Sequence, residues 1–194
     1  VTGVTTIAAG VNFDTVDDIT FNSAVTVNGV SDLSTGLGGA ITFVSTLDGA
    51  AADVTLNSGA GGVSFGDDVG GGAMLSSLDV TGVTSIADGI SITASGSIDF
   101  HSAVVVTGSA TIASALNDVT LDSTVTGDTT GTLNVTGLGN VTIVGLTSDF
   151  TDVTVVGVGI TTVAGVEVSG DIAVSGTAGI TLTGADYTTT AGGV

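Results

Sequence analysis

The feature that most constrains the fold is a long internal repeat, whose second copy begins at Val80, so that the offset is 80 − 1 = 79. Residues 1–29 align with residues 80–108 without a gap, and 15 of the 29 aligned residues are identical. The match continues with a one-residue slip, so that Ile41 aligns with Val119 and Val63 with Val141. We therefore expect one segment, 1–194, with two copies of a long unit (1–79 and 80–158) and a degenerate remainder (159–194).

Inside each unit a short motif of alternating apolar and polar residues recurs, as in Ile19-Thr20-Phe21 and Ile41-Thr42-Phe43. This alternation is typical of a strand with one buried face. The pattern predicts strands centred on Thr5, Asn12, Thr20, Thr26, Thr42, Thr55, Ser64, Asp79, Ser91, Asp99, Val105, Thr111, Thr120, Asn134, Thr142, Thr154, Glu167, Ala173 and Thr181. It predicts inward-pointing side chains at Ile19, Phe21, Val25, Ile41, Phe43, Val54, Leu56, Ile98, Phe100, Val119, Leu121, Val141 and Ile143.

These short strands indicate an all-β chain wound as a parallel β-helix, or β-solenoid, with about 20 residues per coil. Each copy of the long unit would span about four coils, and about ten coils at ~4.8 Å would give a rod roughly 45–50 Å long. An antiparallel sandwich is the alternative, but its strands are usually longer and its core richer in aromatic residues. A membrane barrel fits less well, since it needs ~10-residue strands and aromatic girdles. The absence of Pro suits internal strands that donate hydrogen bonds on every coil.

The charge balance excludes several classes of partner. The chain has 19 acidic residues, no Lys or Arg, and a net charge of −19. Without basic residues it has no means to neutralise phosphates, so nucleic acid and anionic membranes are not expected partners. The same composition predicts that surface salt bridges cannot form and that cations screen the carboxylates.

Other sequence features bear on location and processing. The chain has no Cys, which suits secretion before folding, and no apolar run long enough for a transmembrane helix. It starts at Val1 without a signal peptide, and the pattern is in progress at both ends, without caps. We therefore expect an excerpt or processed piece of a longer chain, whose open ends meet further coils or another copy.

Three segments carry a family resemblance: Val54-Thr55-Leu56-Asn57-Ser58, the glycine-rich segment 62–71, and Leu75-Ser76-Ser77-Leu78-Asp79-Val80-Thr81-Gly82. The chain resembles the filamentous-haemagglutinin-like repeats of very large bacterial exoproteins. The resemblance covers most of the chain and rests on composition and rhythm. It implies a secreted, right-handed parallel β-helical shaft that acts in adhesion, biofilm or cell-surface structure. The sequence departs from that family in having no Lys or Arg and no secretion domain.

Candidate chemical groups are few. His101 is the only histidine, and its equivalents in other copies of the motif are Asn22, Val44 and Asp122, which indicates a solvent-facing position without a catalytic role. The paired carboxylates Asp17, Asp18, Asp67 and Asp68 are weak candidates for calcium, because turn carboxylates can supply some of its oxygen ligands. They could also form a glycosidase pair, but Asp is common in turns, where it bonds its own backbone. We expect no catalytic residue and no cofactor beyond loosely bound calcium.

Two further patterns have ordinary explanations. Thr20, Thr42, Thr55, Thr120 and Thr142 recur at one position of the motif, as in an ice-binding row, but Ser64 and Asp99 interrupt them and Thr is a common outward residue in strands. Asn134 and Asn140 begin formal N-glycosylation sequons that also fit strand and turn sequence.

The sequence favours a non-catalytic extracellular or cell-surface structural protein that associates with copies of itself in a fibre, sheath or surface layer. The alternative is the shaft of a secreted adhesin whose binding tip lies outside this segment. An enzyme would have to be a polysaccharide-active β-helix that uses Asp residues alone.

Overall fold

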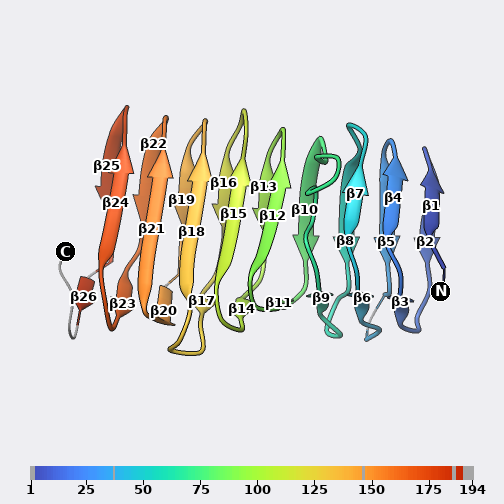
Figure 1. Cartoon of the computed structure of the whole chain (residues 1–194), viewed down its shortest axis with the longest axis horizontal. Helices are drawn as coiled ribbons and strands as arrows, with labels where there is room; N and C mark the ends of the chain where they lie inside the picture. Colours follow the sequence, from blue (N-terminus) through green and yellow to red (C-terminus); the bar gives the residue numbers. More distant parts are fainter. Residues whose placement is uncertain (1–2, 37, 146, 185–186, 190–194) are drawn as a thin grey trace.

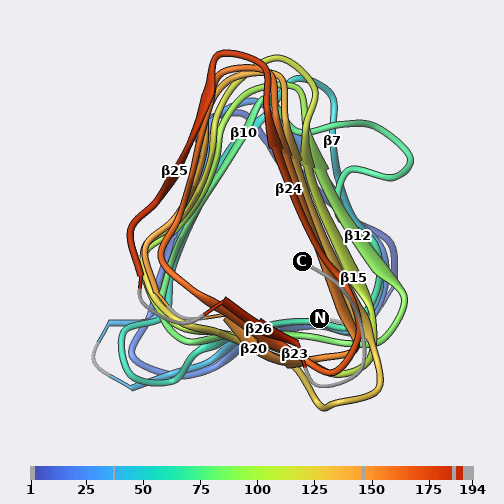
Figure 2. The same ribbon diagram turned by 90° about the vertical axis from the view of Figure 1, so that its left-hand side faces the viewer.

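The computed structural model describes residues 3–36, 38–145, 147–184 and 187–189. In these ranges the chain is all-β and forms a parallel β-solenoid whose cross-section is a triangle (Figures 1 and 2). Seen from the C-terminal end, the chain runs counterclockwise and advances toward the viewer, so the coil is right-handed (Figure 2). The expected fold class is confirmed.

Each side of the triangle is a parallel sheet, and the chain visits sheets A, B and C in that order on every coil. Sheet A has two parts, β1 (Thr5–Ala8), β4 (Val25–Asn28) and β7 (Leu47–Gly49), then β12 (Ile90–Ala94), β15 (Ala110–Ser114), β18 (Thr132–Gly137), β21 (Asp152–Gly157) and β24 (Ile172–Gly176). Sheet B contains β2 (Asn12–Asp14), β5 (Ser31–Ser34), β8 (Asp53–Asn57), β10 (Ser77–Thr81), β13 (Ile98–Phe100), β16 (Val119–Leu121), β19 (Val141–Ile143), β22 (Ile160–Val163) and β25 (Gly179–Leu182). Sheet C contains β3 (Ile19–Phe21), β6 (Ile41–Phe43), β9 (Val63–Phe65), β11 (Thr84–Ile86), β14 (Val104–Val106), β17 (Val125–Thr126), β20 (Thr147–Phe150), β23 (Val166–Val168) and β26 (Tyr187–Thr189).

Sheets B and C each contain nine strands, so the rod has about nine coils and a length of about 40 Å at ~4.8 Å per coil. The expected ten coils and roughly 45–50 Å are therefore slightly too large. The coils differ in length: the step from Thr147 to Val166 is 166 − 147 = 19, and the step from Asp53 to Ser77 is 77 − 53 = 24. Along sheet C, eight successive register pairs connect Ile19 to Tyr187, so the mean coil length is (187 − 19)/8 = 21 residues.

One coil interrupts sheet A. Between β9 and β10 only Val69 pairs with both neighbouring coils, through isolated bridges to Leu47 and Ile92. Residues 70–74 then leave the coil and form the loop that protrudes beside β7 in Figure 2. The Asp48 carboxylate holds this loop, because its Oδ1 accepts hydrogen bonds from the backbone N–H groups of Gly72 (2.7 Å) and Ala73 (3.1 Å).

The core is a narrow column of one or two inward side chains per strand. All thirteen side chains predicted to point inward are buried. Near the N-terminal end, Phe43 stacks between Phe21 and Phe65 with ring centroids 5.2 and 5.8 Å apart, and Phe13 meets Phe21 edge to face at 6.2 Å. Successive coils therefore place equivalent side chains directly above one another, which gives the column its continuity.

Each long unit spans slightly less than the expected four coils. Thr5 pairs through Val25 and Leu47 to Val69, which lies three coils further along sheet A. From Val69 the chain crosses two more sides of the triangle to reach Thr84 on sheet C. The separation of Thr5 and Thr84, 84 − 5 = 79, equals the repeat offset. The repeat thus advances three coils and two sheets. Because the mean coil length is 21 residues, four full coils would need 4 × 21 = 84, which exceeds that offset. As a result, the second copy of each motif lies on a different side of the triangle.

Candidate functional site

The carboxylates at the corners of the triangle join one coil to the next. At six corner positions of the described residues, an Asp carboxylate or Asn carboxamide oxygen accepts a hydrogen bond from a backbone N–H on the following coil. These corner caps are Asp18 to Ala40 (2.8 Å), Asp68 to Ser91 (2.8 Å), Asp88 to Ser109 (2.8 Å), Asp118 to Asn140 (2.7 Å), Asn140 to Ile160 (2.9 Å) and Asp152 to Asp171 (2.7 Å). They satisfy backbone donors where the chain turns between sheets.

The corner caps require close packing of backbone against carboxylate. Gly108 lies beside the Asp88 cap with a φ of +79°, and a Cβ at this position would come within 2.1 Å of Asp88 Oδ1. Both the backbone conformation and the space therefore favour glycine here. The caps were not predicted from the sequence as a group, although Asp or Asn directly before an inward apolar residue, as in Asp18-Ile19 and Asp118-Val119, was the available signal.

The four calcium candidates lie at two separate places. Asp17 and Asp18 precede the N-terminal end of β3 in the first coil, whereas Asp67 and Asp68 follow the C-terminal end of β9 two coils later, at a different corner of the triangle. Asp18 and Asp68 are corner caps, and Asp67 Oδ1 accepts a hydrogen bond from the backbone N–H of Asp68 (2.9 Å). In the part of the chain that the structure describes, no group of three or more His, Cys, Asp or Glu side chains could hold a metal ion.

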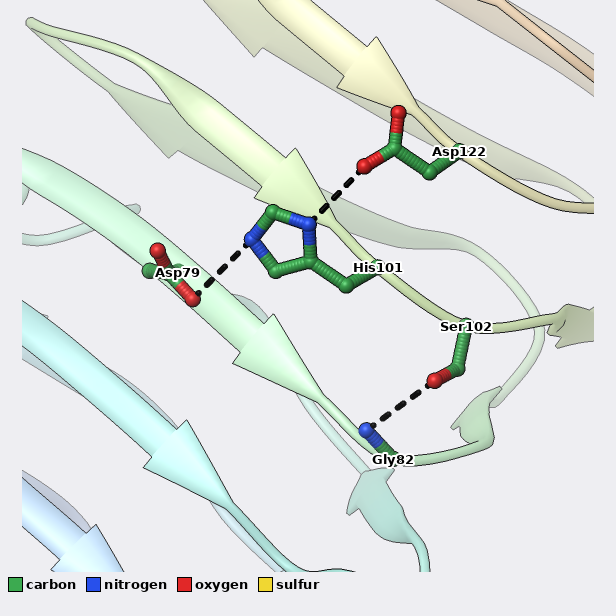
Figure 3. A network of polar contacts seen from close by, with 5 residues as sticks. All are labelled: Asp79, Gly82, His101, Ser102 and Asp122. Atoms are coloured by element: carbon green, nitrogen blue, oxygen red, sulfur yellow. Dashed lines mark hydrogen bonds and ion pairs between the residues drawn. The ribbon is translucent and has the colours of Figure 1, made fainter.

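A group of titratable side chains lies on the outer face of sheet B and is centred on His101 (Figure 3). His101 follows β13, and its Nδ1 lies 2.8 Å from Asp122 Oδ2 on the next coil. Its Nε2 lies 3.4 Å from Asp79 Oδ1 on the preceding coil. Asp99 shares this face, in register between Asp79 and Thr120. His101 thus bridges three consecutive coils.

The surroundings of His101 favour its charged form. Hydrogen bonding to Asp122 raises the pKa of His101 above its ordinary value of 6.5, and Asp79 adds to this, although partial desolvation opposes it. The side chains of His101 and Asp122 are each 41% exposed, so water screens the pair. His101 faces solvent as predicted. However, the prediction that surface salt bridges cannot form is wrong, because His101 supplies a cation whenever its imidazole is protonated.

The His101 group lacks the geometry of a hydrolytic site. Both ring nitrogens face carboxylates, so neither is directed at a nucleophile. The hydroxyl of the neighbouring Ser102 has a different partner, because its Oγ accepts a hydrogen bond from the Gly82 N–H on the preceding coil (3.3 Å; Figure 3). The arrangement can bind a proton and join three coils.

The threonine row expected from the motif is divided between two sheets. Thr20 and Thr42 lie on sheet C, whereas Thr55, Thr120 and Thr142 lie on sheet B. Thr120 and Thr142 lie on sheet B because the second copy of the repeat is displaced by one side of the triangle. Thr55 belongs to the first copy and lies on sheet B because it follows Thr42 by 55 − 42 = 13 residues, which is less than a full coil. On sheet B the row is interrupted by Asp79 and Asp99 and then continues as Thr120, Thr142, Thr162 and Thr181.

Two shallow hollows lie on the outer surface of the described residues. One of about 290 Å³ lies on sheet C around Asp149 and Glu167, and one of about 360 Å³ lies at the corner between sheets A and B, around Asp53 and Asn117. Of the two sequon residues, Asn134 lies on β18 and Asn140 is a corner cap.

Fold and site together define a right-handed parallel β-solenoid with carboxylate-capped corners and an acidic outer surface. Comparison with protein-family models, curated proteins and solved structures finds no match to this chain. Among the described residues, no helix is long and apolar enough to cross a membrane.

Proposed function

We propose that the chain is a non-catalytic structural protein, a solenoid segment that associates with copies of itself in an extracellular fibre, sheath or surface layer. The observation that carries this proposal is the stack of about nine coils, which is continuous along sheets B and C. Parallel pairing and six corner caps join each coil to its neighbours, so the interactions run along the rod axis. A rod built from axial contacts is suited to spanning distance and bearing load.

The chemistry of the surface supports the same function. The last four coils of sheet B carry an outward row of Thr side chains (Thr120, Thr142, Thr162 and Thr181), against which another rod can pack. The acidic charge keeps the rods soluble and limits nonspecific contacts. An extracellular or cell-surface location is supported by the absence of Cys and by the resemblance to exoprotein repeats.

Electron microscopy and analytical ultracentrifugation of the purified chain test this proposal. We expect filaments or sheets in the images, and a sedimentation coefficient that rises when the protein concentration is raised a hundredfold. Isolated rods about nine coils long that remain monomeric over this range would overturn self-association and favour the shaft of an adhesin. A screen of neutral and acidic polysaccharides for cleavage tests the enzymatic alternative, and we expect no turnover.

A further inference from the structure

The inward side chains of sheet B form one continuous row from the first coil to the last. Every step of the row is a register pair between adjacent strands, and every member is apolar. In order the row contains Phe13, Leu33, Leu56, Val80, Phe100, Leu121, Ile143, Val163 and Leu182. Seven of the nine side chains are buried, and the two exceptions are the two ends, Phe13 and Leu182.

The C-terminal end of this row opens into an apolar hollow. The hollow has a volume of about 260 Å³ and is lined by Ile172, Val174, Ile180, Leu182 and Tyr187. Ile180 and Leu182 occupy inward positions of β25, yet they are 48% and 54% exposed, because β25 is the edge strand of sheet B. The hollow is therefore the part of the solenoid core that the described residues leave uncovered beside β25.

The opposite end presents a matching surface. Strand β2 is the other edge of sheet B, and Phe13 points inward from it, only partly covered and in contact with the ring of Phe21. Val11 precedes Phe13 by two positions, as Ile180 precedes Leu182, and it is 37% exposed. Both ends thus expose the same pair of inward rows, on strands that run in the same direction.

We propose that the C-terminal face of one copy receives the first coil of a second copy, with β2 pairing in parallel with β25. This inference rests on the proposed self-association and specifies its surface and register. Phe13 of the second copy then covers Leu182, so the inward row continues across the junction at the spacing of ~4.8 Å found within the rod. The interface joins two different surfaces of the molecule. A head-to-tail contact of this kind does not close on itself, so its repetition builds an open filament.

The register also places two outward residues side by side. The outward row of sheet B runs from Asn12 through Asp32 to Thr181, and Thr181 would be followed by Asn12 of the next copy. Neighbouring Cα atoms about 4.8 Å apart lie within the range that a disulfide can bridge. Because the chain has no Cys, introduced thiols report this contact without background.

The test is oxidative cross-linking of the double variant Asn12→Cys/Thr181→Cys in the full chain. We expect a ladder of reducible dimers, trimers and longer species on a non-reducing gel. The matched control is Asn12→Cys/Thr162→Cys, since Thr162 lies one coil further from the junction and its Cα would be about 9.6 Å from the partner thiol, beyond the reach of a disulfide. In the proposed register, this control forms less than a tenth of the oligomeric species.

The outcomes separate this inference from the proposed function. If the chain forms filaments but the matched pair links no better than the control, the register is wrong and self-association stands. If the unmodified chain stays monomeric in ultracentrifugation and the matched pair does not link, both are wrong. A third variant, Leu182→Asp, places a charge in the hollow; we expect it to shorten the filaments at least tenfold while leaving the circular dichroism spectrum unchanged, and filaments of unchanged length would overturn the proposed surface.

Discussion

At the scale of single residues, His101 makes stability depend on pH. Its pKa is raised in the folded chain, so its contribution is complete below the unfolded value of 6.5 and is lost as pH rises through the folded value. We expect His101→Gln to lower the free energy of unfolding by about 0.5–1 kcal/mol at pH 5.5 and by a few tenths at pH 8.5, the range of exposed ion pairs. Urea unfolding at the two pH values measures this difference.

The partner residue provides the control. Asp122→Asn removes the stronger of the two contacts of His101, so it should reduce the pH-dependent part of the stability in the same direction. An equal loss at pH 5.5 and pH 8.5 for His101→Gln would show that the imidazole contributes packing rather than charge.

The corner caps allow a comparison of two adjacent aspartates. The side chain of Asp18 accepts a hydrogen bond from the backbone N–H of Ala40. At Asp17 the hydrogen bond involves the backbone instead, because its N–H donates to Thr15 Oγ1 (3.1 Å). We expect Asp18→Ala to cost about 1–2 kcal/mol of unfolding free energy, as hydrogen bonds to charged groups do, and Asp17→Ala to change it by less than about 0.5 kcal/mol. Chemical denaturation of both variants gives the comparison.

The same pair tests the calcium hypothesis. If calcium raises the melting temperature of the unmodified chain and Asp17→Ala abolishes that rise, the carboxylates of this corner bind the ion. Equal losses of stability in Asp17→Ala and Asp18→Ala without calcium would contradict the assignment of Asp18 as a corner cap.

At the scale of strands, the alternating pattern in the sequence best predicts the strands whose inward residues are both apolar. All nineteen predicted strand centres lie in strands, and seven of the described strands were missed: β5, β7, β11, β17, β20, β22 and β26. Several of these have a polar residue at an inward position, such as Ser31 in β5, Thr84 in β11 and Thr161 in β22, each of which is buried. The alternating apolar pattern does not predict these strands, because a residue with a hydroxyl group takes the place of an apolar side chain in the core. The strands form because they pair with the coils above and below.

Within this architecture the stacked phenylalanines of sheet C carry much of the N-terminal packing. Phe43 is buried with a ring on either side, so Phe43→Ala removes both contacts and leaves a cavity. We expect a loss of about 3–5 kcal/mol in unfolding free energy, measured by urea denaturation. Phe13→Ala, at the partly exposed end of the cluster, should cost on the order of 1–2 kcal/mol. Equal losses would mean that the column does not act as a continuous core.

At the scale of the whole molecule, the sequence predicts the solenoid but not which residues share a side. The fold class, the handedness and the buried apolar pairs follow from short alternating strands and the family resemblance. The side on which a residue lies depends on the sum of all preceding coil lengths, and these are unequal. A small error in each coil accumulates, which is why Thr20 and Thr120 were assigned to one row and lie on different sheets. For the same reason the group around His101 could not be predicted: Asp79 and Asp122 contact it only because the two intervening coils have particular lengths.

The distribution of charge over the rod governs how rods pack side by side. Six carboxylates lie on the outer face of sheet B in the first six coils, Asp14, Asp32, Asp53, Asp79, Asp99 and Asp122, whereas Thr142, Thr162 and Thr181 occupy the last three. In ~0.1 M salt the screening length is about 10 Å, so repulsion between rods depends on which faces meet. We therefore expect the carboxylates of sheet B to prevent neighbouring rods from packing against this face.

Neutralising this face should cause bundling. Aspartate side chains ordinarily take up protons near pH 4, so light scattering of the assembled chain in ~0.1 M salt should rise as pH falls from 7 to 3.5, or when calcium is added at pH 7. The variant Asp14→Asn/Asp32→Asn/Asp99→Asn should bundle at a higher pH than the unmodified chain. Its control, Asp17→Asn/Asp67→Asn/Asp128→Asn, removes the same charge from corners and loops and should shift the onset less. If the two triple variants shift the onset equally, net charge rather than sheet B keeps the rods apart, and if neither acid nor calcium changes the scattering, the carboxylates do not separate them at all.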